Sequence, residues 1–330
     1  MVQKPEARRL SGEFDLITRY FAPLSGKGAF GLRDDAALYT PRPGHDLIIT
    51  QDAIHEGIHF LRDDPRDLVA KRALRTNISD MIAKGGTPVS YSLALGLPDW
   101  FCDSDVAGLA RGLSEDQARY DVYLSGGDTF RSPTALTLSI TLIGEVPTGT
   151  YRSRLGAKVG DVIAVTGTIG DATLGLRFRL AEQKQEGEAA QVLMASQMLP
   201  EPPFGVESII RKYASASMDV SDGLIGDLRK LCTASHVAGH VEAELVPLLP
   251  EARELVDRDG NLADLITGGE DYQTLATFPA DKIEQAEQMA RNAGLRLTKI
   301  GMITGQGDGS VAVTMNGVPM SFERESFAHT

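Results

Sequence analysis

Residues 45–53, HDLIITQDA, form a nearly continuous apolar and β-branched run, and residues 64–86, DPRDLVAKRALRTNISDMIAKGG, follow with apolar side chains three and four positions apart. The first pattern predicts a strand in a sheet covered on both faces, and the second an amphipathic helix that ends at its two glycines. Two further strand-like runs, residues 89–98 and 136–146, flank a helical pattern at residues 104–121. This alternation predicts an α/β fold with mixed (α+β) sheets.

The pattern changes after the last of these strands. Residues 147–161, PTGTYRSRLGAKVGD, are polar and glycine-rich, and a fresh strand-like run, VIAVTGTIG, begins at residue 162. A chain of 330 residues exceeds the usual size of one hydrophobic core. We therefore expect two domains, residues 1–147 and residues 148–330, the second ending in a hairpin at Asn316-Gly317.

Composition narrows the class of protein. The chain is 42% apolar and 24% charged, as globular proteins are, and no stretch approaches the roughly 20 apolar residues of a membrane helix. The start, MVQKPEARRL, lacks the apolar segment of a secretory signal, so we expect a cytoplasmic protein without membrane contact. A net charge of −12 disfavours a nucleic-acid partner, but divalent cations can stand between carboxylates and phosphates.

Acidic residues beside glycines or other small residues recur at the expected ends of strands and helices. The six motifs are Arg33-Asp34-Asp35-Ala36-Ala37, Thr50-Gln51-Asp52, Asn77-Ile78-Ser79-Asp80, Ser125-Gly126-Gly127-Asp128-Thr129, Asp219-Val220-Ser221-Asp222-Gly223 and Gly268-Gly269-Glu270-Asp271. Taken alone, such an Asp is more often a turn residue or a helix cap, and Asp222 is the strongest candidate for a plain N-cap. Because Mg²⁺ takes oxygen ligands from separate segments, their number predicts a shared metal site.

Glycine-rich segments offer a second kind of phosphate contact. Gly126-Gly127 and residues 167–170, GTIG, could cradle phosphate with backbone N–H groups or could be tight turns, and both interpretations stay open. The sequence contains no P-loop, no strand–GxGxxG–helix fingerprint, no GxSxG elbow and no HExxH. Cys102 and Cys232 lie too far apart for a zinc motif.

With these motifs in order, the chain resembles the thiamine-monophosphate kinase family, within the superfamily of aminoimidazole ribonucleotide synthetase. The resemblance spans nearly the whole length. It is carried by GEFDLITRYF (12–21), DDAAL (34–38), QDAIHEGIHF (51–60), NISDMIAKGGTP (77–88), SGGDT (125–129), SRLGAKVGD (153–161), VTGTIGDA (165–172), MDVSDGL (218–224) and GGEDYQ (268–273).

The resemblance implies a two-domain aminoimidazole ribonucleotide synthetase-like fold. Residues 1–147 would bind ATP and magnesium and form a homodimer, and residues 148–330 would complete the active site. It also implies the last step of thiamine diphosphate biosynthesis, in which thiamine monophosphate is phosphorylated with ATP as co-substrate and several Mg²⁺ ions as cofactors.

Site residues follow from the resemblance position by position. The implied metal ligands are Asp35, Thr50, Gln51, Asp52, Asp80, Asp128, Asp219 and Asp222. Gly127, Asp128, Arg154 and Ser221 resemble the nucleotide contacts, and His59, Glu270 and Phe327 the contacts to the thiamine substrate.

Three departures from the family pattern accompany this match. Arg33 stands where Gly usually precedes Asp-Asp, and Gln51 stands where Thr is common, which favours a metal contact through its main-chain carbonyl. The chain ends in SFERESFAHT, with Phe327 in the place of the usual aromatic residue.

The acceptor's chemistry agrees with this residue set. The second pKa of a phosphate monoester is about 6, so its oxygen is mostly ionised near pH 7 and needs no general base. We expect no covalent nucleophile, direct in-line transfer, carboxylates that hold metal, Arg154 as a phosphate clamp and His59 orienting the acceptor. Two alternatives are another ATP-dependent enzyme of the superfamily, such as a ring-closing synthetase, and a noncatalytic nucleotide- or metal-binding relative.

Overall fold

The structure, a computed structural model, describes residues 12–181 and 187–322. Contacts divide the chain into two compact units. One is built from residues up to Met81 and from Thr87–Thr148, and the other from Ile82–Gly86 and from Gly149 onward. Each unit has its own mixed sheet with helices, which confirms the predicted α/β class.

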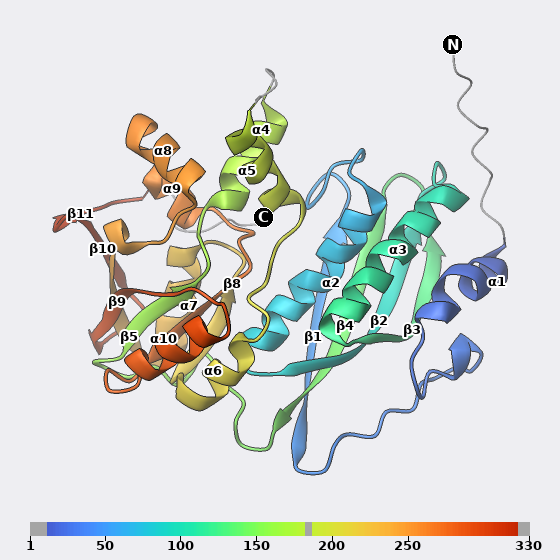
Figure 1. The fold of residues 1–330 in the computed structure, drawn as a ribbon, viewed down its shortest axis with the longest axis horizontal. Coiled ribbons are helices and arrows are strands. Elements are labelled where there is room, and N and C mark those ends of the chain that lie inside the picture. The colour runs from blue at the N-terminus through green and yellow to red at the C-terminus, as the bar shows by residue number, and fades with distance from the viewer. Residues whose placement is uncertain (1–11, 182–186, 323–330) are drawn as a thin grey trace. The chain divides into compact units, whose positions relative to one another are not determined.

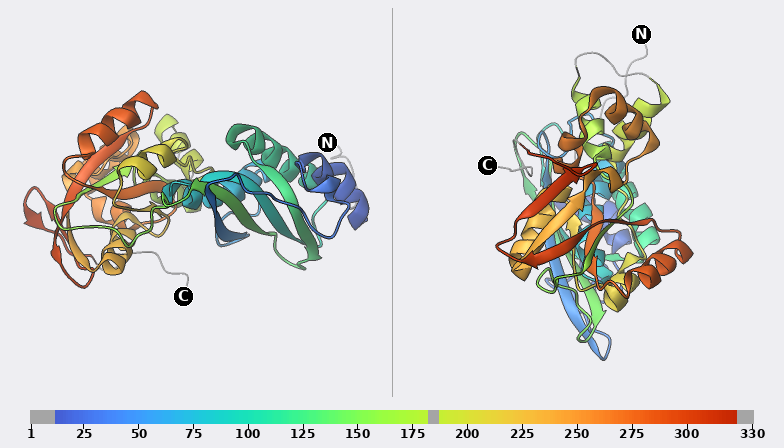
Figure 2. Two further views of the ribbon diagram at one scale, coloured as in Figure 1. Left: turned by 90° about the horizontal axis from the view of Figure 1, so that it is seen from below. Right: turned by 90° about the vertical axis from the view of Figure 1, so that its left-hand side faces the viewer.

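The first unit is a four-stranded sheet with helices on one face (Figure 1). In chain order its elements are α1 (Glu13–Leu16), a π-helix (Ile17–Phe21), 3₁₀ turns at Ala22–Leu24 and Phe30–Leu32, β1 (His45–His55), α2 (Arg66–Ala83), β2 (Thr87–Leu97), α3 (Asp103–Tyr120), β3 (Tyr123–Arg131) and β4 (Thr137–Pro147). The strand order is β1-β4-β2-β3, and only the β2–β3 pair is parallel. Figures 1 and 2 both show α2 and α3 covering the same face.

The prediction that β1 is covered on both faces is wrong within this unit. Ile48 and Ile54 are buried, whereas Leu47 is 46% exposed and Ile49 is 65% exposed. Alternate residues of a strand point to opposite faces, and the described helices of the unit cover one face only. A run of apolar residues therefore did not distinguish a buried strand from one with an open apolar face.

The second unit is a seven-stranded mixed sheet covered on both faces. Its elements are β5 (Val162–Thr166), α4 (Asp171–Leu180), α5 (Glu188–Met198), α6 (Val206–Tyr213), β6 (Ala216–Val220), α7 (Leu224–Ser235), β7 (Val237–Glu242), a 3₁₀ turn (Ala243–Leu245), α8 (Pro250–Asp259), α9 (Leu262–Thr267), β8 (Gln273–Phe278), α10 (Ile283–Asn292), β9 (Leu297–Gln306), β10 (Val311–Met315) and β11 (Val318–Pro319). The strand order is β11-β10-β7-β9-β5-β8-β6.

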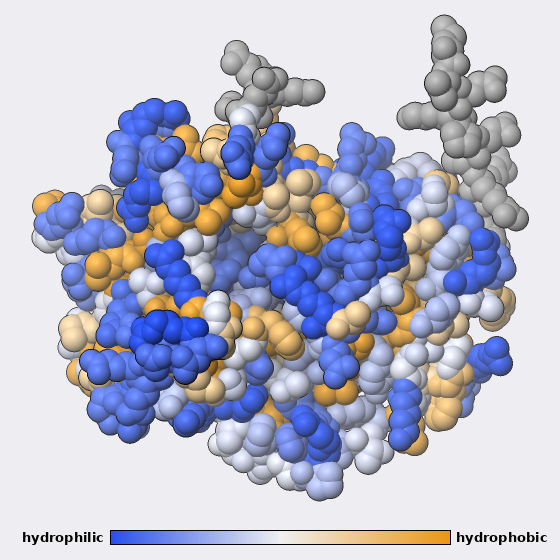
Figure 3. Space-filling model, viewed as in Figure 1, coloured by the Kyte–Doolittle hydropathy of each residue, from blue (hydrophilic) through white to orange (hydrophobic). Residues whose placement is uncertain are grey.

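Burial along β5 shows how the two faces are filled. Ile163 and Val165 join the core cluster that contains the apolar side of α7, while Ala164, also buried, is not part of that cluster. Helices α6 and α10 pack against each other and contact β8 and β9. The outer surface of α10 is hydrophilic (Figure 3), as expected of an amphipathic helix with Ile283 buried on its inner side.

The hairpin predicted at Asn316-Gly317 is confirmed, since both residues have positive φ and Met315 pairs with Val318. No helix in the described ranges is both long and apolar enough to cross a bilayer.

A buried ion pair joins α2 to α3 and gives a test of the first unit's packing. Arg75 Nε lies 2.7 Å from Asp116 Oδ2, and both side chains are almost fully buried. Asp116→Ala would leave a buried guanidinium without its carboxylate, so the free energy of unfolding should fall by about 3 kcal/mol. Urea unfolding followed by fluorescence of Trp100, the single tryptophan, measures this loss.

The matched control is Glu115→Ala, because the neighbouring Glu115–Lys71 pair has a carboxylate that is 51% exposed. Its loss should cost at most about 1 kcal/mol. Equal effects of the two substitutions would show that the buried pair does not hold α2 against α3.

Candidate functional site

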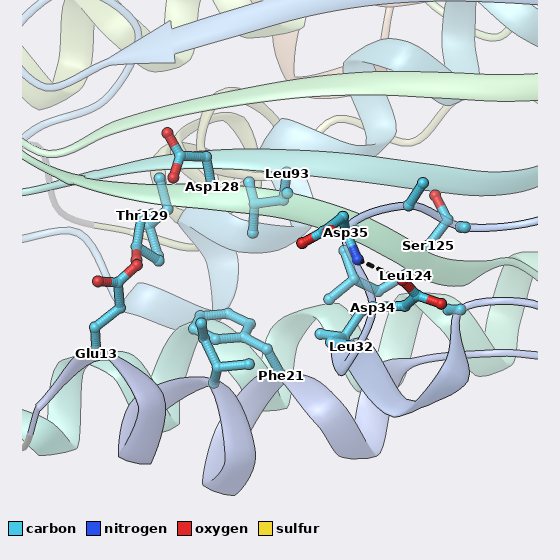
Figure 4. A pocket seen from close by; sticks show the side chains of 17 residues that line it. Glu13, Phe21, Leu32, Asp34, Asp35, Leu93, Leu124, Ser125, Asp128 and Thr129 are labelled. Atoms are coloured by element: carbon cyan, nitrogen blue, oxygen red, sulfur yellow. Dashed lines mark hydrogen bonds between the residues drawn. The ribbon is translucent and has the colours of Figure 1, made fainter.

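The first unit contains a pocket of about 170 Å³ between its N-terminal turns and strands β2 and β3. Phe21 and Leu32 line it from the N-terminal side, and Leu93 and Leu124 from the strands (Figure 4). At one end Thr129 Oγ1 donates a hydrogen bond to Glu13 Oε1 at 3.0 Å. The apolar walls suit a flat, uncharged ring system, and sequence reasoning had not identified any of these residues as binding residues.

The glycines at 126 and 127 lie on β3 where it lines the pocket, and at Gly127 the backbone of β3 comes very close to that of β2. A Cβ atom at Gly127 would lie 2.0 Å from the carbonyl oxygen of Leu93 on β2. Gly126 has open space around the same position, and Ser125 Oγ donates to the carbonyl oxygen of Tyr91 at 3.0 Å. Only a glycine at 127 therefore lets β3 run this close to β2, which places Asp128 at the pocket.

Three predicted acidic residues line this pocket. Asp34 Oδ1 accepts a hydrogen bond from the Asp35 amide at 2.8 Å, while the carboxylates of Asp35 and Asp128 have no hydrogen-bond partner among the described residues. Asp128 points from β3 away from Phe21 (Figure 4). Arg33 has φ −109°, a conformation open to any residue, so its replacement of the family's glycine puts no strain on this loop.

A second polar group lies between β1 and α2. Thr50 Oγ1 donates to Asp80 Oδ2 at 2.5 Å, and the Asp52 amide donates to Asn77 Oδ1 at 3.1 Å. Gln51 alternates to the other face of the sheet, where its Nε2 contacts Ser139. Thr50, Asp52 and Asp80 are thus brought together, and Gln51 could join them only through its main chain.

His59 lies in the turn after β1. Its Nδ1 accepts a hydrogen bond from the His55 amide at 3.1 Å, which orients the ring. The proposed acceptor contact of His59 stays a prediction.

In the second unit two predicted loops interlock through glycines. A Cβ at Gly223 would meet the Thr267 carbonyl oxygen at 2.5 Å, and one at Gly269 would meet the Ser221 carbonyl oxygen at 2.4 Å. The Glu270 amide donates to that same Ser221 oxygen at 2.8 Å. The segments 219–223 and 268–271 therefore form one connected surface, on which Glu270 has the strained φ of 74°.

Asp222 does not cap α7, which corrects the N-cap prediction. The N-cap position is Gly223, and the Asp222 carboxylate pairs instead with Lys230, two turns into the helix. Asp227 accepts hydrogen bonds from the amides of Ser221 and Asp222 at 3.0 and 2.9 Å. Burial raises the pKa of Asp227, and Lys230 opposes this shift.

The GTIG segment is a bent connection that turns the chain from β5 into α4. The Gly167 amide donates to the Arg296 carbonyl, that of Ile169 to the Pro247 carbonyl and that of Gly170 to Asp271 Oδ2. Three amides of the segment are therefore already hydrogen-bonded within the protein, which leaves them unavailable to cradle a phosphate.

A second pocket, of about 160 Å³, opens beside this turn, and we call it the acidic pocket. It is lined by Thr168, Asp171, Ala172, Ser196, Leu199, Pro200, Glu201, Leu249, Glu270, Asp271 and Gln273. Burial raises the pKa of Asp171 from its ordinary value to about 6 and raises that of Asp271 well above its usual range. Asp271 is held by the N-terminus of α4, whereas Asp171 was not among the predicted site residues.

The remaining predicted residues are placed as follows. Arg154 is exposed, and its carbonyl oxygen accepts a hydrogen bond from Ser235 Oγ at 2.7 Å, while its guanidinium has no partner among the described residues. Asp219 is buried on β6. Phe327 lies outside the described residues.

Magnesium requires oxygen donors, and both units contain carboxylates that could supply them. Nowhere in the described ranges do three His, Cys, Asp or Glu side chains converge on one point. Magnesium usually takes only one or two protein carboxylates and fills its octahedron with water and substrate phosphates. The oxygen donors at Asp35, Asp128 and the Thr50–Asp80 pair fit that requirement, although their ligand roles stay predictions.

Comparison with known proteins identifies the class first. Residues 33–146 match AIR synthase related protein, N-terminal domain, and residues 158–314 match AIR synthase related protein, C-terminal domain. The fold and its loops thus define a two-domain protein of the AIR synthase related class.

Individual relatives identify the family. The thiamine-monophosphate kinase of Caulobacter vibrioides is 39% identical over 306 residues, which cover 89% of this chain and 85% of the relative. The solved thiamine-monophosphate kinase of Stenotrophomonas maltophilia K279a has a TM-score of 0.78 at 34% identity, covering 88% of this chain and 91% of its own. "AaThiL complexed with AMPPCP and TMP" has a TM-score of 0.76 at 31% identity and covers 97% of both chains. The chain belongs to the thiamine-monophosphate kinase family and is a kinase, which confirms the resemblance.

The raised pKa of Asp171 predicts a dependence of stability on pH. Because the folded-state pKa of about 6 exceeds the ordinary value of 3.8, the folded protein binds this proton more tightly than the unfolded chain. The penalty is absent below pH 4, grows as pH rises to 6 and is complete above it. Asp171→Asn should therefore raise the free energy of unfolding by up to about 3 kcal/mol at pH 8 and by little at pH 4.

Thermal unfolding of both proteins across this pH range, followed by circular dichroism, measures the difference. The control is Asp161→Asn, since Asp161 is equally buried but accepts a hydrogen bond from the Lys158 amide at 2.9 Å. That variant should be destabilised at pH 8. A gain for Asp171→Asn that did not change with pH would contradict the assignment.

Proposed function

We propose that this chain transfers the γ-phosphoryl group of ATP to thiamine monophosphate and releases thiamine diphosphate and ADP. The observation that carries the proposal is its match over 97% of both chains to a relative complexed with AMPPCP, an ATP analogue, and TMP. The two pockets support it, because one has apolar walls with carboxylates at its rim and the other is acidic. Cytoplasmic location and the lack of a nucleic-acid partner stay predictions.

The donor side of the reaction uses the first-unit pocket. Phe21, Leu93 and Leu124 would hold the adenine ring away from water, and the triphosphate would extend past Gly127. Arg154 would neutralise phosphate charge with its guanidinium, which has no partner among the described residues.

The transfer itself needs no protein base. A phosphate oxygen of the acceptor, mostly ionised near pH 7, attacks the γ-phosphorus in line, the bond to the β-phosphate oxygen breaks, and ADP leaves with the electron pair.

Positioning two anions is the main difficulty. Several magnesium ions, when bound, would neutralise charge between carboxylates and phosphates. The proposed ligands are Asp35, Thr50, Asp52, Asp80, Asp128, Asp219 and Asp222, with the main-chain carbonyl of Gln51. His59, Glu270 and Phe327 are proposed to contact the acceptor.

Incubation with ATP, Mg²⁺ and thiamine monophosphate, followed by chromatography, should yield thiamine diphosphate and ADP in equal amounts. Asp128→Asn should lower kcat/KM by about 100-fold, because a metal–carboxylate interaction contributes several kcal/mol to transition-state stabilisation. Asp264→Asn, which removes an exposed ion pair with Arg177, is the matched control and should retain full activity.

Binding of ATP without any product would favour the noncatalytic relative. ADP formed together with a dehydrated, ring-closed product from another substrate would favour a synthetase of the superfamily. Full activity of Asp128→Asn would remove that residue from the proposed metal site.

We also propose that a second copy of the chain covers the open face of the first sheet. Leu47 and Ile49 on β1, Ile143 on β4 and Phe130 on β3 share this face according to the strand register. Leu47, Ile49 and Phe130 are each more than 40% exposed within the described chain, and burying apolar surface of this kind yields roughly 25 cal/mol per Å².

Ile49→Lys would place a charge in the centre of this face. We expect the variant to elute as a monomer while the unchanged protein elutes as a dimer, measured by light scattering after gel filtration. The control is Leu38→Lys, an exposed apolar residue outside the face, which should leave the dimer intact. A monomeric parent protein, or a dimer that tolerates Ile49→Lys, would contradict this interface.

A further inference from the structure

One carboxylate oxygen of Asp171 has no partner of good hydrogen-bond geometry among the described residues. Oδ2 accepts a hydrogen bond from Thr168 Oγ1, whereas Oδ1 is buried and has no partner with hydrogen-bond geometry among the described residues. The residue is only 6% exposed. The backbone N–H of Leu249 acts on this carboxylate and lowers its pKa, but it does not reach hydrogen-bond geometry with Oδ1. A poorly satisfied buried acceptor costs free energy, so this oxygen is a candidate for a better-aligned ligand donor.

The acidic pocket around it has walls of two kinds. Ala172, Leu199, Pro200 and Leu249 supply apolar surface, while Asp171 and Glu270 supply carboxylates. No lysine, arginine or histidine is among the described residues that line it. The pocket therefore favours a flat ring that is positively charged or carries N–H donors, and it disfavours anions.

The acidic pocket lies next to the loop that contains Ser221, which is expected to contact phosphate. Glu270 lines the pocket, and its amide donates to the Ser221 carbonyl at 2.8 Å. A ligand whose ring occupies the pocket would need to extend past one loop to bring a phosphate group to Ser221. A phosphorylated heteroaromatic cation has this arrangement of groups.

We propose that Asp171 determines acceptor specificity: its Oδ1 accepts a hydrogen bond from an amino group on the heteroaromatic part of the acceptor. The inference rests on the proposed function, since thiamine monophosphate carries an exocyclic amine on its pyrimidine ring and a cationic thiazolium. Asp171 acts through recognition of the ring and takes no part in bond making.

A structural role for Asp171 leads to a different result on substitution. If it served only to accept the Thr168 hydrogen bond at the start of α4, Asn would replace it without effect on substrate, because Asn keeps an acceptor oxygen. If Oδ1 instead accepts a hydrogen bond from the substrate amine, Asn cannot replace Asp. The Asn side-chain oxygen would accept the Thr168 hydrogen bond, its NH₂ group would point toward the substrate amine, and two hydrogen-bond donors would face each other.

The test compares thiamine monophosphate with oxythiamine monophosphate, in which an oxo group replaces the amine. The unchanged protein should prefer the amine. Asp171→Asn should raise KM for thiamine monophosphate by about 10- to 100-fold, leave KM for ATP unchanged and reduce the preference between the two acceptors by at least about 10-fold. The buried control Asp161→Asn should keep both KM values and the preference.

Unchanged KM and preference in folded Asp171→Asn would overturn the proposal. Asp171→Ser serves as the second variant if Asn does not fold. Calorimetric titration of both acceptors into the unchanged protein needs no turnover, and equal affinities there would also overturn it. Failure of the proposed function is distinguishable, because the unchanged protein would then make no thiamine diphosphate from ATP, whichever acceptor its pocket binds.

Discussion

Repulsion between carboxylates and phosphates is the constraint on which the rest of this molecule depends. The chain carries a net charge of −12, yet a solved relative is complexed with AMPPCP and TMP. The structure distributes many of its acidic residues in small groups on separate loops, and within the described ranges no three His, Cys, Asp or Glu side chains meet closely enough to hold one metal ion. Carboxylates spaced in this way can each share a cation with water and phosphate. The acidic pocket is different, because burial raises the pKa of both Asp171 and Asp271, and neighbouring carboxylates add to the rise for Asp271.

Backbone contacts at glycine keep these groups in place. Gly127 lets β3 pass close to β2, and Gly223 and Gly269 let two loops of the second unit interlock. Any side chain at these positions would clash with the neighbouring backbone carbonyl and push the strands or loops apart. The positive φ of Glu270 fits the same pattern, because strain of this kind persists where surrounding contacts hold a functional side chain in one orientation.

Much of the fold and part of the site could be predicted from local patterns. The spacing of apolar residues identified the main strands and helices α2 and α3, and the turn residues identified the hairpin at Asn316-Gly317. Nine short motifs identified the family. The predictions that failed concern features that depend on tertiary packing. The open face of β1 depends on which elements cover it, and the partner of Asp222 is a lysine two helical turns away. The buried, half-satisfied carboxylate of Asp171 exists only because separate segments meet around it, although the VTGTIGDA motif had contained it.

Calorimetric binding of AMPPCP, with and without Mg²⁺, tests the central claim most directly. If the acidic loops can accept phosphate only across divalent cations, the analogue should bind in Mg²⁺ and lose at least about 100-fold in affinity when EDTA removes it. Equal affinity under both conditions would contradict the account, because the carboxylates would then not be holding metal between themselves and the nucleotide.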